Sequence, residues 1–167
     1  MKQQKDDQAD DATPATNEQR YIPYSASRDA SHPQGRRVLL VEDDRDLRTE
    51  LAHVLRMERY QVTCAENGEV ALRILNEGFV PDLILLDVWM PVTDGLAFKR
   101  QLEADARFIH IPVVVLTADA QYARQHVQRD MAAQAYLLKP FELSELLATV
   151  RCWCGADSRQ TQQQQGA

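Results

Sequence analysis

The sequence has few cysteines, no long hydrophobic run and no obvious targeting segment. Cys64, Cys152 and Cys154 form neither an even disulfide set nor a CxxC motif, so we expect reduced thiols. No apolar run approaches the roughly 18 residues that a membrane span requires, and the polar start of the chain lacks a signal-peptide core. We therefore expect a cytoplasmic protein without a membrane partner.

Positive charge is also scarce. The net charge is -6, from 19 basic and 25 acidic residues, and no basic cluster is longer than Arg36-Arg37. Nucleic acids and anionic surfaces bind clustered positive charge, so we expect no direct nucleic-acid partner. In contrast, the hydrophobic fraction of 44% in 167 residues is sufficient for the core of one domain.

Composition divides the chain into three regions. Residues 1–35 are polar and lack apolar periodicity, which predicts a disordered tail whose one apolar group is residues 21–24. Residues 36–153 carry the pattern of a folded domain, and residues 154–167 form a Gln-rich tail that we expect to be disordered. The sequence contains no visible repeat or second domain, so we expect a stand-alone module without an output domain.

Short apolar segments alternate with helical patterns throughout the central region. The runs 83–86 and 113–116 are uninterrupted, which is typical of strands buried on both faces of a parallel sheet, whereas 60–65 alternates like a strand near an edge. The predicted strands are 37–41, 60–65, 83–87, 111–117 and 135–138. This alternation predicts an α/β fold with a five-stranded parallel sheet and helices on both faces.

Several residues predict where the helices begin, end and pack. Asp44 is suited to N-cap the first helix, and Gly78 to end the second. Residues 120–132 have a thin apolar stripe, so we expect a loosely held helix there. The apolar residues predicted to form the buried stripe of the last helix are Leu143, Leu146, Leu147 and Val150, with Trp153 closing the core.

Reactive side chains occur where the predicted strands end. Glu42 and Asp43 follow the first strand, Asp87 ends the third, Thr117 ends the fourth, and Lys139 follows the fifth. Because the carboxyl ends of parallel strands meet at one edge, we expect these side chains to lie together. The consecutive acids after the first strand repel one another, so they either sit in water or share a cation. Asp87 alone would be equally compatible with a turn cap.

Five sequence motifs around these residues resemble, in their order and spacing, those of the receiver domain of two-component response regulators. The gaps fit: 44 positions from Asp43 to Asp87, 30 to Thr117 and 22 more to Lys139. The motifs are Val-Glu-Asp-Asp (41–44), Leu-Asp-Val-Trp-Met-Pro (86–91), Asp-Gly (94–95), Leu-Thr-Ala (116–118) and Tyr-Leu-Leu-Lys-Pro-Phe (136–141). The resemblance covers residues 36–153 and implies a doubly wound, flavodoxin-like sheet of order 2-1-3-4-5.

The resemblance also implies a magnesium site and a phosphoacceptor. Asp43, Asp87 and the backbone carbonyl of Trp89 would be ligands of Mg²⁺, which prefers oxygen, and Glu42 would hold a metal-bound water. Asp87 would accept a phosphoryl group from the phosphohistidine of a sensor histidine kinase or a phosphotransfer protein. Lys139 would neutralise charge on the transferred group.

Thr117 and Tyr136 are the switch residues that the resemblance implies. Thr117 would move toward the phosphoryl group and the Tyr136 ring would turn inward, which would reshape the face of the fourth helix, fifth strand and fifth helix for a downstream protein target. The same face could also form a dimer when the protein is phosphorylated. The segment 131–135 lacks the glycine and acids usual in the family, so the shape of this face stays open. Pro140 fits a cis bond after Lys139.

Two alternatives remain. A phosphatase or phosphotransferase of the haloacid-dehalogenase type also uses an Asp nucleophile with Mg²⁺, but it requires a second Asp two positions later, where Trp89 stands. A degenerate receiver that serves only as a binding module is disfavoured by the intact acids, Thr117 and Lys139. We expect no enzymatic activity beyond self-phosphorylation and self-dephosphorylation, with Trp89 shielding the phosphate on Asp87 from water.

Overall fold

The computed structural model describes four stretches of the chain: residues 35–90, 95–123, 125 and 133–154. The predictions for the two tails lie outside these ranges, except at Gly35 and Cys154. The Asp94 turn residue, Pro91 and most of the predicted 120–132 helix also lie outside them. Within the described residues, no helix is both long enough and apolar enough to cross a bilayer.

Five parallel strands form one sheet in the order β2-β1-β3-β4-β5, which confirms the predicted fold class and strand order. The strands are β1 (Arg37–Val41), β2 (Gln61–Ala65), β3 (Leu83–Asp87), β4 (Val113–Thr117) and β5 (Ala135–Leu138). β3 and β4 are buried at every position, while the edge strand β2 is mostly half-buried. β4 begins later than predicted because Pro112 has no N–H to give to the ladder.

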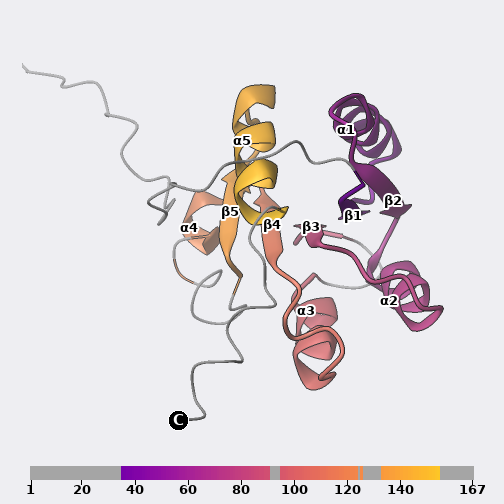
Figure 1. Ribbon diagram of the computed structural model, residues 1–167. Coiled ribbons are helices and arrows are strands. Elements are labelled where there is room, and N and C mark those ends of the chain that lie inside the picture. Colours follow the sequence, from indigo (N-terminus) through magenta and orange to yellow (C-terminus); the bar gives the residue numbers. More distant parts are fainter. Residues whose placement is uncertain (1–34, 91–94, 124, 126–132, 155–167) are drawn as a thin grey trace, which may run out of the picture.

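Helices cover both faces of the sheet. The helices are α1 (Arg45–Met57), α2 (Gly68–Asn76), α3 (Gly95–Ala104), α4 (Ala120–Tyr122) and α5 (Leu143–Cys154). α1 and α5 lie on one side of the sheet and α2 and α3 on the other (Figure 1), and each pair closes its own apolar cluster. Leu146 and Val150 are fully buried in one of these clusters.

At α5, the structure corrects two details of the sequence analysis. Leu143 was expected in the buried stripe, but it is 47% exposed because it opens the first turn, beyond the end of the core. The helix continues to Cys154, which is buried one residue past the predicted end of the domain. Cys64, Cys152 and Cys154 are free thiols, as predicted.

The two predicted caps fix where α1 begins and where α2 ends. Asp44 Oδ1 accepts hydrogen bonds from the N–H groups of Asp46 and Leu47, both at 2.9 Å, so α1 starts directly after the acidic segment. Gly78 has φ of +99°, and its N–H donates to the carbonyl of Leu75 at 3.1 Å, which closes the end of α2. The short loops that follow β1 and precede β3 are therefore set by local sequence.

Candidate functional site

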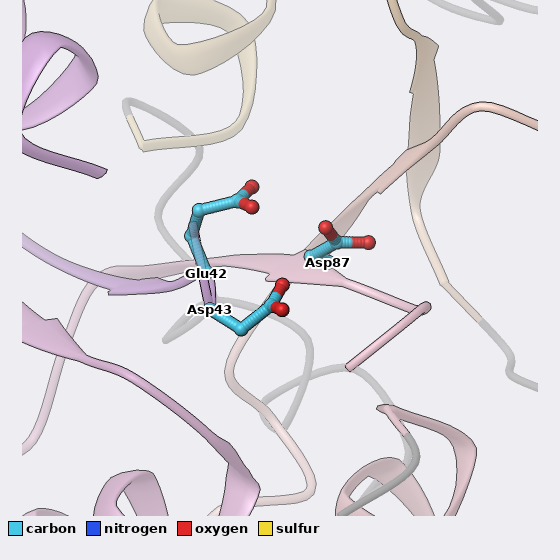
Figure 2. Close-up of side chains that lie close together, drawn as sticks. All are labelled: Glu42, Asp43 and Asp87. Atoms are coloured by element: carbon cyan, nitrogen blue, oxygen red, sulfur yellow. The ribbon is translucent and has the colours of Figure 1, made fainter. Parts of the chain in front are cut away.

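Three carboxylates gather at the carboxyl edge of the sheet. Glu42 and Asp43 follow β1, Asp87 ends β3, and one oxygen from each lies within 4.8 Å of the others (Figure 2). The register explains this grouping, because β1 and β3 are neighbours and pair Val41 with Leu86, directly before the acids. The predicted acids are therefore brought together by the crossover that places β3 beside β1.

Lys139 reaches two of these acids across the width of β4. Its Nζ lies 2.7 Å from Glu42 Oε2 and 2.7 Å from Asp87 Oδ2, although these residues are 97 and 52 positions away in the chain. Glu42 is only 1% exposed and Asp87 5%. Buried carboxylates are costly without a compensating charge, so the Lys139 ammonium balances this pocket. The Lys139–Pro140 peptide bond is cis.

Burial and the ion pairs together raise the pKa values of two groups, Glu42 and Lys139. Burial raises the pKa of Glu42 to about 7, although the hydrogen bond from Lys139 lowers it and the charge of Asp87 raises it further. For Lys139, burial acts to lower the pKa, but the hydrogen bonds to Asp87 and Glu42 and the negative charges of these two groups together outweigh burial, and the pKa is raised overall. Lys139 therefore remains a cation at neutral pH.

The residues directly after Asp87 stay close to the ends of β3 and β4, and the Val88 N–H donates to the carbonyl of Leu116 at 3.3 Å. Asp87 Oδ1 accepts a hydrogen bond from the Trp89 N–H at 2.9 Å, and the Trp89 side chain is 58% exposed. The Trp89 ring packs against that of Tyr122 in α4, with 5.4 Å between ring centroids. A Cβ atom at Gly95 would lie 2.7 Å from the carbonyl oxygen of Asp87, so α3 approaches the end of β3 as closely as only glycine allows.

Thr117 and Tyr136 lie beside this cluster on neighbouring strands. Thr117 is fully buried at the end of β4, one residue beyond Leu116, which is the register partner of Asp87. Thr117 Oγ1 accepts a hydrogen bond from the Asp119 N–H at 3.1 Å. Tyr136, in β5, is half-buried and is the register partner of Val115 in β4. Since residues two apart in a strand share a face, Thr117 lies on the same face of β4 as Val115.

Three residues around the site have roles that were not predicted from the sequence. Asp119 caps α4 through hydrogen bonds to two backbone N–H groups, which the pattern of an acid before a helical segment could have indicated. Gly95 was assigned only to a turn, because its approach to β3 depends on the tertiary structure. Arg48 contacts the backbone of the acidic segment, and no pattern of residue types signals that contact.

The fold and the site define a doubly wound α/β domain with a carboxylate pocket beyond the carboxyl ends of its strands, where ligands bind in this architecture. A family profile described as "Response regulator receiver domain" matches residues 38–151. The chain belongs to this family, and its receiver domain is therefore of the phospho-accepting kind found in two-component systems that include histidine kinases.

Individual relatives agree with this assignment. Response regulator MprA from Mycolicibacterium vanbaalenii is 40% identical over 115 residues, which cover 69% of this chain and 48% of MprA. The chain thus spans about half the length of the curated relatives that it matches first.

Two solved structures with magnesium resemble this one. Response regulator TrrA from Thermotoga maritima, in complex with Mg²⁺ and BeF, matches with a TM-score of 0.63 and 31% identity over 71% of this chain and 98% of TrrA. The receiver domain of sensor histidine kinase PA1611 from Pseudomonas aeruginosa, with a magnesium ion in its active-site cleft, gives 0.64 and 33% identity, over 73% of this chain and 99% of its own.

Proposed function

We propose that this chain accepts a phosphoryl group on Asp87, with Mg²⁺, from a sensor histidine kinase or a phosphotransfer protein, and signals through protein contacts. One observation carries the proposal. A buried aspartate at a strand end is hydrogen-bonded to a lysine at 2.7 Å, and its carboxylate lies within 4.8 Å of two further acids. This arrangement unites a nucleophile, a cation and a set of oxygen ligands in one pocket.

The chemistry of the pocket fits Mg²⁺. Asp43, Asp87 and the carbonyl of Trp89 are the groups that would hold the ion directly, with Lys139 bonded to one oxygen each of Asp87 and Glu42. Glu42 would then hold a water of its coordination shell. Mg²⁺ bound there would supply positive charge where phosphoryl oxygens gather negative charge. The magnesium in the TrrA and PA1611 structures supports this assignment.

In the proposed transfer, a carboxylate oxygen of Asp87 attacks the phosphorus of a phosphohistidine. The P–N bond breaks, its electron pair returns to the imidazole nitrogen, and an acyl phosphate forms on Asp87. Lys139, which donates a hydrogen bond to Asp87 Oδ2 before the transfer, is close enough to donate to the incoming phosphoryl oxygens. The Thr117 hydroxyl accepts from the Asp119 N–H, and a hydroxyl that accepts one hydrogen bond can still donate its own proton, here to the phosphoryl group.

The proposed output passes through Thr117 and Tyr136. A shift of Thr117 toward the phosphoryl group would break its bond with the Asp119 N–H, and Asp119 caps the start of α4. The change would reach the Tyr136 side of β5 and the face of α4, β5 and α5, which we propose as the docking surface for a downstream protein or a second copy of the chain. We propose no enzymatic activity on other substrates.

Incubation with acetyl phosphate tests the proposal. With Mg²⁺ we expect one acid-stable, base-labile phosphate per chain, and none with EDTA or in the Asp87→Asn variant. Sustained turnover of phosphate esters would instead support the haloacid-dehalogenase alternative. A folded protein that takes no label would support a receiver that only binds partners. Screening purified histidine kinases against the wild type and Asp87→Asn would then identify the donor.

A further inference from the structure

Arg48, near the start of α1, donates hydrogen bonds to three consecutive carbonyls of the acidic segment. Its Nη1 lies 2.6 Å from the carbonyl oxygen of Glu42 and 3.0 Å from that of Asp43. Its backbone N–H donates to the carbonyl of Asp44 at 2.9 Å. A single residue therefore takes up every carbonyl of the segment that carries two of the three clustered acids.

The charge of Arg48 is directed at the backbone and away from the nearby carboxylates. The ion pairs among the described residues do not include Arg48, even though four acids lie between positions 42 and 46. Glu42 pairs with Lys139, and Asp44 caps α1. The Asp43 carboxylate therefore stays available at the pocket, while the guanidinium acts on the peptide groups on either side of it.

These contacts fix the direction of the Asp43 side chain. The carbonyl of Glu42 belongs to the peptide plane before the Asp43 Cα, and the carbonyl of Asp43 belongs to the plane after it. Because peptide groups are planar, anchoring both planes sets the φ and ψ angles of Asp43 and hence the direction of its Cα–Cβ bond. That bond directs the carboxylate toward Asp87 (Figure 2).

We infer that Arg48 is a positioning residue for the cation site: it clamps the peptide groups that flank Asp43 and so holds this carboxylate where, with Asp87, it binds Mg²⁺. The inference rests on the proposed function, since it concerns the same ion. Arg48 does not itself touch the ion or the phosphoryl group. Its positive charge opposes cation binding, so its geometric and electrostatic effects on Mg²⁺ affinity have opposite signs.

Calorimetric titration with MgCl₂ separates the two effects. In Arg48→Met, which keeps a long apolar stem but no donor, we expect Mg²⁺ binding to weaken about 10-fold or more, as is usual when a partner that orients a metal ligand is lost. The matched control is Arg45→Met: it removes the same charge from the first turn of α1, where the Arg45 side chain is exposed. In this control we expect unchanged or slightly tighter binding.

Two further variants complete the test. Arg48→Lys should recover most of the lost affinity, because a single nitrogen contacts both carbonyls in the wild type. If Arg48→Met does not fold, Arg48→Gln replaces it, because it is also neutral and too short to span both carbonyls. Equal or tighter Mg²⁺ binding by the folded neutral variant would overturn the inference, whereas a wild type that does not bind Mg²⁺ would overturn the proposed function instead.

Discussion

Replacing Lys139 with methionine would leave two buried carboxylates without their shared cation. The ammonium lies 2.7 Å from both Glu42 and Asp87, and these two side chains are 1% and 7% exposed. Removing one partner of a buried ion pair costs about 3 to 5 kcal/mol, and the 20% exposure of the Lys139 side chain favours the lower end. We expect a loss of about 3 kcal/mol in the absence of Mg²⁺, or a melting temperature lower by about 10 °C.

The loss should grow with pH. Burial raises the pKa of Glu42 to about 7, while the hydrogen bond from Lys139 acts to lower it. Removing Lys139 should therefore raise the pKa of Glu42 further. A carboxyl group whose pKa is higher in the folded state binds more protons there, so its contribution to stability is full at low pH and is lost as pH rises. In the wild type, this pH window runs from 4.5, the ordinary pKa of a glutamate carboxyl group, to about 7. In Lys139→Met the window extends to higher pH.

Urea unfolding with EDTA or with saturating MgCl₂, below and above neutral pH, measures this effect. The proposed Mg²⁺ would bind only the folded pocket, and a ligand at about 100 times its Kd stabilises by about 2.7 kcal/mol, so it should restore most of the loss. Lys99→Met is the matched control, because Lys99 is also buried but, among the residues that the structure describes, forms its ion pair with Glu103 in α3, at 2.8 Å. Its stability should not respond to Mg²⁺ differently from that of the wild type.

The reasoning would be refuted by equal losses in the two lysine variants with no difference in Mg²⁺ response. It would also be refuted if Lys139→Met lost more stability at low pH than at high pH. Either outcome would mean that the Lys139 ammonium does not offset the charges of Glu42 and Asp87 in the folded protein.

Three further predictions concern the surroundings of the site. Gly95→Ala should lower the free energy of unfolding by about 1 to 3 kcal/mol and slow phosphorylation, since its Cβ would lie 2.7 Å from the Asp87 carbonyl. Gly78→Ala has open space for its Cβ but a φ of +99°, so it should lose stability in urea without slowing phosphorylation. Trp89→Ala should hydrolyse its phosphate faster, and an unchanged half-life would count against shielding by Trp89. Burial raises the pKa of Cys154 to about 12, so alkylation of the native protein near pH 8 should leave this thiol unmodified.

Most of the fold is encoded in local patterns. The uninterrupted apolar runs of β3 and β4 predict central strands because both of their faces are covered, and the alternation in β2 predicts an edge strand. Asp44 and Gly78 predict helix ends because their chemistry satisfies free backbone groups. The prediction of burial for Leu143 was wrong, because helical spacing alone does not show where the core ends.

The site was only partly predictable. The positions of strand ends and the spacing of the acids predicted that the reactive residues lie at one edge of the sheet. They did not indicate that Glu42 is fully buried or that Lys139 donates hydrogen bonds to both Glu42 and Asp87. The contacts of Arg48 with carbonyls and of Gly95 with β3 involve backbone atoms of other segments. Such contacts depend on how elements pack, which residue type and spacing do not specify.

Mapping the phosphorylated residue tests the central claim most directly. The protein is treated with acetyl phosphate and Mg²⁺, the acyl phosphate is reduced with borohydride, and the modified peptide is sequenced by mass spectrometry. The account predicts modification at Asp87 alone, lost with EDTA and strongly reduced in Lys139→Met. Modification at Asp43 or at another carboxylate, or equal labelling of Asp87 with and without Mg²⁺, would contradict it.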